Sequence, residues 1–219
     1  MRDLLARPRD AARVRAITLF ATIMLVGCVT VTTTNNPTMA PDWHLYGGIE
    51  IGAVVALPAS WRAFDLDKEI EQAANACSSN PAARDALRPN LERIHAGGVR
   101  LLACDTGHLT DLGLVVAYAS KAPVPDGGVD KYLDDLKQGA GREVLERKHV
   151  SANAGDMIVQ RVRERVAGTN GTVSDTTHYQ FLVIRLSAMQ YLIVEVPTAL
   201  VSAVGADVER IGTSFTPLR

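Results

Sequence analysis

An uncharged apolar run near the start of the chain, residues 16–27, decides in which compartment the rest has to fold. The run is twelve residues long and follows five arginines within the first fifteen positions. A membrane-spanning helix needs roughly 20 apolar residues, so this run is short for a bilayer span. A basic segment followed by an apolar stretch of about 7–15 residues is typical of a secretory signal. We therefore predict that residues 1–27 are a signal peptide and take no part in the folded domain.

The run ends in Leu25-Val26-Gly27-Cys28, which resembles the bacterial lipobox, with leucine three positions before a cysteine and a small residue directly before it. The resemblance implies cleavage before Cys28 and lipid on its thiol, so that the chain is held at the extracytoplasmic face of the cell membrane. Two or more acyl chains, palmitate among them, anchor a protein stably where one is marginal. The alternative is a buried cysteine at the end of an uncleaved signal anchor. Residues 28–42 are rich in Thr, Asn and Pro without periodicity, which predicts a polar tether.

Charge and motifs disfavour several classes of function. Removing residues 1–27 takes away five arginines and two aspartates, which leaves 18 basic and 22 acidic residues. A mildly acidic domain is poorly suited to nucleic acid, whose binding depends on neutralising phosphates. The sequence has no P-loop, no Gly-x-Gly-x-x-Gly and no Gly-x-Ser-x-Gly, and its five histidines form no His-x-x-x-His pair. We therefore expect no cofactor, no metal site and no catalytic residues.

Hydrophobic periodicity predicts a single α+β domain over residues 43–219. Apolar alternation and apolar runs predict strands at 49–58, 99–104, 112–118, 142–150, 155–167, 175–186 and 191–197. Spacings of three and four predict helices within 66–96, broken at Pro81, from 129 to about 139, and from 199 to about 211. Residues 168–171 predict a hairpin loop. Because short turns join most neighbouring strands, we predict a mainly antiparallel sheet sandwiched by helices, with residues 66–96 as a helical insert.

Two local motifs resemble PsbP-like domains. In residues 49–61 a strand ends in proline and Trp61 follows closely, and residues 208–215 are similar to the closing helix and terminal Ser-Phe of these domains. The resemblance covers about residues 48–217 and implies an antiparallel sheet between helices, as in mycobacterial lipoproteins of the LpqN kind. Family members include assembly factors, extrinsic subunits and adaptors. They share no catalytic motif that maps onto this sequence.

Cys77 and Cys104 are the two cysteines that remain once Cys28 is lipidated. In an oxidising extracytoplasmic compartment an even pair is readily joined in a disulfide. Such a bond would tie the helical insert to the strand at 99–104, and it would stabilise the fold by about 3–4 kcal/mol in the chain-entropy model. The alternative is two independently buried thiols. The stretch from Cys104 to His108 contains metal-binding residue types, but we expect the disulfide to consume Cys104.

Arg161, Arg163 and Arg165 form the surface feature that most suggests a partner. At strand spacing the three side chains project from one face, near further basic residues of the strand at 142–150. One interpretation is a docking patch for an acidic partner or a phosphorylated headgroup. The other is a solvated face whose arginines pair across strands with residues such as Asp175 or Glu143.

These observations leave three hypotheses about function. The leading one is a membrane-anchored, non-enzymatic lipoprotein of the cell envelope that binds or scaffolds another envelope protein. The second is a carrier of a lipid or another apolar ligand, held in a cavity between sheet and helices. The third is a hydrolase with a dispersed active site. A deep apolar cavity would favour the carrier, whereas a cleft with a histidine and an acidic partner would favour the enzyme.

Overall fold

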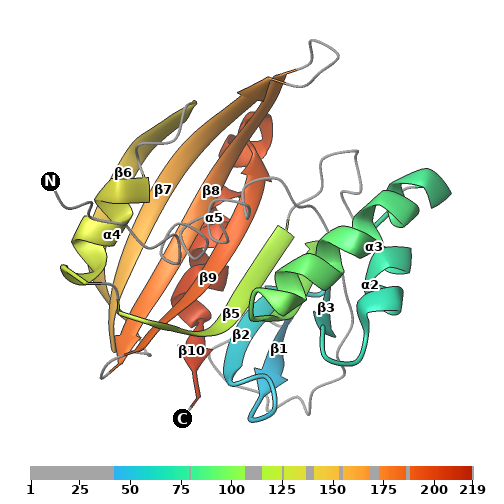
Figure 1. Ribbon diagram of the computed structural model, residues 1–219, viewed down its shortest axis with the longest axis horizontal. Helices are drawn as coiled ribbons and strands as arrows, with labels where there is room; N and C mark the ends of the chain where they lie inside the picture. The colour runs from blue at the N-terminus through green and yellow to red at the C-terminus, as the bar shows by residue number, and fades with distance from the viewer. Residues whose placement is uncertain are drawn as a thin grey trace, which may run out of the picture.

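The centre of the molecule is a seven-stranded sheet in which each neighbouring pair of strands is antiparallel (Figure 1). The computed structural model describes residues 42–78, 80–106, 115–124, 126–136, 141–152, 155–167, 173–185 and 188–218. In spatial order the strands are β3 (Trp61–Asp65), β4 (Val99–Asp105), β5 (Val115–Pro123), β9 (Ala188–Pro197), β8 (Val173–Arg185), β7 (Gly155–Ala167) and β6 (Arg142–Ala152). The sheet therefore consists of two groups of consecutive strands, β3 to β5 and β6 to β9, which are joined where β5 pairs with β9. This topology confirms the predicted α+β class with a mainly antiparallel sheet.

A second, small sheet joins the two ends of the described chain. Its strands are β1 (Trp43–Gly48) and β2 (Ala53–Pro58), which form a hairpin, and β10 (Thr216–Pro217), which pairs with β2. Gly47 has φ +113°, and a Cβ atom there would lie 2.0 Å from the backbone oxygen of Ala53. Only glycine fits at this position, because other residues rarely adopt that φ and would collide with β2.

The large sheet is covered on both faces, and its side chains alternate between them. On β8, Tyr179 and Phe181 belong to one buried apolar cluster, whereas Leu182 belongs to the other. We call the first side the α5 face, because α5 (Val201–Ser214) and the small sheet cover it. We call the second side the α2–α4 face. The helices that cover it, which lie in front of the sheet in Figure 1, are α2 (Ile70–Ala76), α3 (Pro81–Ala96) and α4 (Gly128–Leu136).

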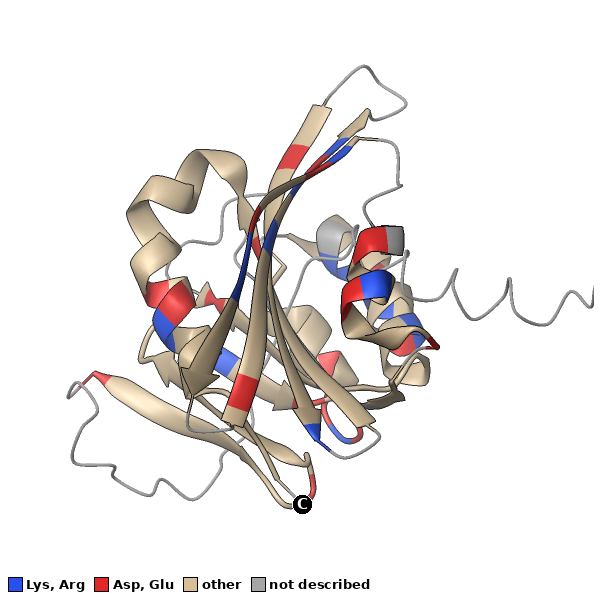
Figure 2. Cartoon of the chain, turned by 90° about the vertical axis from the view of Figure 1, so that its left-hand side faces the viewer, with Lys and Arg blue, Asp and Glu red and all other residues tan. Residues whose placement is uncertain are grey.

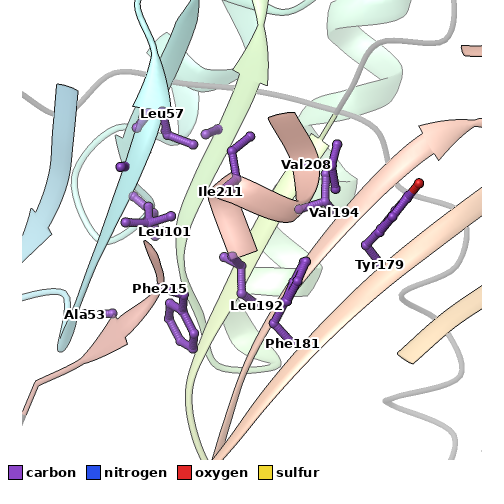
Figure 3. Close-up of a cluster of buried hydrophobic side chains, with 14 of the residues drawn as sticks. Ala53, Leu57, Leu101, Tyr179, Phe181, Leu192, Val194, Val208, Ile211 and Phe215 are labelled. Carbon is purple, nitrogen blue, oxygen red and sulfur yellow. The ribbon is translucent and has the colours of Figure 1, made fainter. Parts of the chain in front are cut away.

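The α5 face holds the larger of the two cores. Figure 3 shows Val208 and Ile211 of α5 in one cluster with Phe181 and Leu192 of the sheet. A short 3-10 helix, η3 (Thr198–Leu200), leads from β9 into α5. At the other end of α5, the Ser214 hydroxyl accepts a hydrogen bond of 2.9 Å from the backbone N–H of Ala56 in β2. This contact fastens the closing helix to the small sheet.

The α2–α4 face is packed by apolar side chains from all three of its helices. Leu91 of α3 and Leu133 of α4 have no exposed surface, and Ala73 of α2 is equally buried. They belong to one cluster with Phe64 of β3 and Leu182 of β8. The sheet is therefore sandwiched by helices, as the sequence predicts.

Most of the predicted elements are confirmed, with corrections near the amino-terminal end of the fold. The predicted strand 155–167 coincides with β7, and the helical region 66–96 contains α2 and α3 with a break before Pro81. The predicted strand 49–58 is wrong at its start, because residues 49–52 form the hairpin turn between β1 and β2. Strands β1, β3 and β10 were not predicted. Strands β1 and β10 owe their conformation to pairing with β2, and β3 owes its conformation to pairing with β4, rather than to patterns of their own.

Several predictions concern residues outside the described ranges. These are the signal peptide at 1–27, Cys28, the tether up to residue 41, His108, the hairpin loop at 168–171 and the first part of the strand at 112–118. Among the helices that the structure does describe, none combines the length and the apolar character needed to span a membrane.

Candidate functional site

The three arginines singled out in the sequence lie on β7 and point to the α5 face, as alternation with Val162 and Glu164 requires. Their guanidinium groups are half-exposed, and Arg165 is the most accessible, with 57% of its side chain exposed. Figure 2 shows basic and acidic residues interspersed along the outer strands of the sheet. The predicted common face is therefore present, but it is not uniformly basic.

Asp175 of β8 binds two of the three arginines. Arg163 makes a bidentate contact, with Nε 2.8 Å from Oδ1 and Nη2 2.5 Å from Oδ2. Arg165 Nε donates to Oδ2 at 3.2 Å, and the Thr198 hydroxyl donates to Oδ1 at 2.7 Å. These donors, Arg163 first among them, hold the pKa of Asp175 well below its usual range. Asp175 is therefore an anion under all ordinary conditions and joins β7, β8 and η3.

Arg161 has a different set of partners on the edge strand. Its Nη2 lies 3.3 Å from Glu146 of β6, and its guanidinium lies over the Tyr179 ring, 5.9 Å from the centroid. Glu146 also contacts Lys148 at 3.4 Å, and Lys148 reaches Glu209 of α5 at 3.7 Å. A chain of ion pairs thus runs from the outer strands to α5.

The interpretation as a solvated face paired across strands accounts for these contacts. Asp175 was one of the two partners predicted, and the other, Glu143, stands opposite Arg163 in the β6–β7 register and raises the pKa of Arg163 together with Asp175. Because each arginine has an acidic neighbour, an acidic partner would have to compete with Glu146 and Asp175 for them. Docking at Arg161, Arg163 and Arg165 stays a prediction.

The predicted disulfide between Cys77 and Cys104 is confirmed. The two Cα atoms lie 6.6 Å apart across 27 positions of the sequence, and both cysteines are buried. Cys77 follows the last residue of α2, and Cys104 lies in β4. The bond therefore clamps the short helix α2 to the edge of the sheet that carries β3 and β4.

A buried row of charges crosses the α2–α4 face, and hydrophobic periodicity does not predict it. We define the charged row as Arg142 of β6, Glu164 of β7, His178 of β8 and Glu195 of β9. Arg142 Nε donates to Glu164 Oε1 at 2.8 Å, and Glu164 Oε2 lies 3.2 Å from His178 Nε2. His178 Nδ1 lies 3.3 Å from Glu195 Oε1. All four side chains are at most 13% exposed.

Burial and ion pairing act in opposite directions on the pKa values of this row. Burial alone would lower the pKa of His178, but its contacts with Glu164 and Glu195 outweigh burial and raise the pKa to about 9. Burial would raise the pKa of Glu164, yet His178 and Arg142 lower it overall. For Glu195 burial dominates and raises the pKa in spite of His178. At neutral pH His178 is therefore an imidazolium.

A second set of polar side chains lies next to the charged row on the same face. Arg147 Nε donates to Gln160 Oε1 at 2.7 Å, and Gln160 Nε2 donates to Gln180 Oε1 at 3.2 Å. The guanidinium of Arg147 also lies 3.5 Å from Asp130 and 2.9 Å from Asp134 of α4. Arg147 thus fastens α4 to the edge strand of the sheet.

The chemistry available to these groups is limited by their mutual contacts. A general base needs a free lone pair near the operating pH, whereas His178 is protonated and held between two carboxylates. Within the described part of the chain, no group of three or more His, Cys, Asp or Glu side chains is arranged to hold a metal ion. The charged row can stabilise and position strands, and it offers no activated nucleophile.

One signal in the sequence could have pointed to the charged row. Glu195 interrupts the otherwise apolar run 191–196, and a charge inside a buried strand needs a partner. Naming that partner requires the strand order and register, which place Glu195 opposite His178. Periodicity supplies neither of these.

No protein-family model matches the sequence, and no curated protein matches it. The solution structure of cyanobacterial PsbP from Synechocystis sp. PCC 6803 is similar, with 13% identity and a TM-score of 0.47 over 84% of this chain and 97% of that chain. A crystal structure of a protein of unknown function from Pseudomonas aeruginosa, described as a putative regulator, has 14% identity and a TM-score of 0.39 over 81% and 98% of the two chains. At such identities the likeness concerns the fold alone.

Proposed function

We propose that the chain is a lipid-anchored module of the bacterial cell envelope that acts by binding another envelope component and not by catalysis. Cys28 carries the lipid in this account, residues 29–42 form the tether, and the domain from residue 43 onward faces away from the cytoplasm. The partner is an acidic surface of an envelope protein, which meets the outer strands of the sheet on the α5 face.

The observation that carries the proposal is the Cys77–Cys104 disulfide. The chain has three cysteines, and this bond takes the two that belong to the domain. Disulfides persist in oxidising compartments, which supports export by the signal that residues 1–27 resemble. Cys28 is then the cysteine left without a disulfide partner, at the position where the lipobox resemblance requires a thiol.

We infer binding rather than catalysis because the buried ionisable groups contact one another. His178 lies between two carboxylates, and Glu164 is shared between His178 and Arg142. These contacts stabilise the sheet and leave no lone pair on the imidazole for proton abstraction. The partly exposed groups of the α5 face, above all Arg165, remain accessible for contact with a partner.

The lipid anchor is tested by comparing Cys28→Ala with the double variant Cys77→Ala/Cys104→Ala in a bacterial host. We expect Cys28→Ala to leave the membrane fraction or to accumulate as an unprocessed precursor. The double variant keeps the lipidation thiol and should stay in the membrane fraction, although its domain is less stable. Normal processing and membrane retention of Cys28→Ala would contradict the proposal.

The docking surface is tested by chemical cross-linking in intact cells. Reversing the charge of Arg161, Arg163 and Arg165 to Glu should abolish a cross-linked product that the parent chain forms. The matched control reverses three arginines of α3 on the other face of the sheet, Arg84, Arg88 and Arg93, and should leave that product unchanged. Equal loss in both variants, or loss in neither, would reject this surface.

A further inference from the structure

His178 is the one member of the charged row that touches two others. It lies in β8 between strands β7 and β9, each of which supplies one carboxylate at 3.2 Å and 3.3 Å. Its two ring nitrogens face different strands, Nε2 toward Glu164 and Nδ1 toward Glu195. His178 Nε2 and Glu164 Oε2 form an ion-pair contact at 3.2 Å, and within the described part of the chain neither atom has a well-aligned hydrogen bond.

Only the protonated imidazole can present an N–H group to each of the two carboxylates. A neutral ring has one N–H and one lone pair, so the lone pair would face the second carboxylate at close range. The row contains Arg142 and His178 as cations and Glu164 and Glu195 as anions, so it is neutral when His178 is protonated. Loss of that proton leaves one buried negative charge without a partner, which is strongly unfavourable.

None of the described helices contributes a charged group that acts on His178. The acidic residues of α4 that reach the sheet, Asp130 and Asp134, pair with Arg147. Between α2 and α3, Glu71 pairs with Arg88. The charged groups that act on His178 are therefore Glu164 from β7 and Glu195 from β9, with Arg142 of β6 bound to the far side of Glu164.

We propose that the charged row is a proton-dependent latch that fastens the outer strands β6 and β7 to the rest of the sheet. With the proton on His178, ion pairs link the four strands of the row. Without the proton, hydration stabilises Glu164 and Arg142 more than their contacts in the protein interior do. Strands β6 and β7 then separate locally from β8 before the rest of the fold opens. The arginines of β7 move with them.

The proton is followed directly by NMR of the intact chain with isotope-labelled histidine, whose five rings give few and separable signals. We expect both nitrogens of His178 to carry hydrogen at pH 7 and its titration midpoint to lie near 9. A midpoint near the ordinary value of 6.5 would overturn the proposal. In Glu195→Gln, where one carboxylate charge is gone, the midpoint should fall, and an unchanged midpoint would also count against the latch.

Opening of the outer strands is followed by limited trypsin digestion at pH 7 and at pH 10. Trypsin cuts after Arg161, Arg163 and Arg165 only where β7 opens, and the ratio of these cuts to the cut after Arg93, an exposed arginine of α3, removes the effect of pH on the protease. We expect the ratio to rise several-fold at pH 10. His178→Gln should show the raised ratio at both pH values.

The matched control for this digestion is His149→Gln, which replaces an exposed histidine of the edge strand β6. It should behave as the parent chain does. A ratio that stays constant with pH in the parent chain, or that responds to His149→Gln as strongly as to His178→Gln, would overturn the latch.

Discussion

Gly212 of α5 lies directly against the ring of Phe181 in β8: a Cβ atom at position 212 would come within 1.9 Å of the ring. The helix approaches the sheet this closely because hydrogen is the only side chain there. Gly205, nearly two turns earlier on α5, also faces β8, but a Cβ atom there would meet only the Tyr179 hydroxyl at 3.2 Å.

This pair of glycines gives the first prediction. Gly212→Ala should lower the free energy of unfolding by about 1–3 kcal/mol or more, because overpacking displaces Phe181 or the helix. Gly205→Ala is the matched control, since alanine favours the helix by roughly 1 kcal/mol over glycine and the contact it makes is mild. Urea denaturation measures both variants. Equal effects at the two positions would contradict the packing described here.

The second prediction concerns the disulfide. Replacing Cys77 and Cys104 by alanine should lower the free energy of unfolding by about 3–4 kcal/mol, the value the chain-entropy model gives for a loop of this length. Denaturation in urea, with and without reductant, measures this difference. Cys28→Ala is the control and should leave the unfolding curve of the domain unchanged. Reductant that has no effect on the parent chain would argue that the bond does not form in the isolated protein.

The third prediction is the pH dependence of stability. The pKa of His178 is raised from 6.5 to about 9, so its contribution is fully present below pH 6.5 and is lost as the pH rises through 9. This loss is on the order of 3 kcal/mol. His178→Gln should flatten the unfolding free energy between pH 7 and 10, whereas His149→Gln should not. A parent chain whose stability is constant over this interval would exclude a buried imidazolium.

The fourth prediction concerns the arginines that Asp175 holds. Asp175→Asn removes the charge that binds Arg163 and Arg165, so both guanidinium groups become available to an outside anion. The variant should elute later from a cation exchanger at neutral pH than Asp207→Asn, which makes the same change in net charge at an exposed site on α5. Coelution of the two variants would show that Asp175 does not mask the arginines.

How far the fold follows from the sequence depends on whether an element carries its own pattern. Strand β7 could be predicted to its ends because its apolar run at 157–159 leads into arginines at every second position, 161, 163 and 165. The same alternation correctly placed Arg161, Arg163 and Arg165 on one face. Strand β1 carries no such pattern, since two of its six residues are glycine, and its conformation comes from pairing with β2.

The charged row marks the limit of sequence reasoning at the candidate site. Arg142 and Glu195 are more than fifty positions apart, and three strand pairings have to be known to connect them, including a diagonal step from Glu164 to His178. The disulfide could be predicted from the sequence because two cysteines in an oxidising compartment have few possible partners other than each other. His178 has no such constraint, and its role depends on carboxylates from two neighbouring strands.

The most direct test of the proposed function is the intact mass of the protein extracted from the membranes of its bacterial host. The account predicts a chain that begins at Cys28 and carries the added mass of a diacylglycerol thioether, with or without a further acyl chain. The same sample should show the Cys77–Cys104 disulfide after digestion without reductant. A chain that still begins at Met1 with a free thiol at Cys28 would contradict the lipid anchor and the placement of the domain in the envelope.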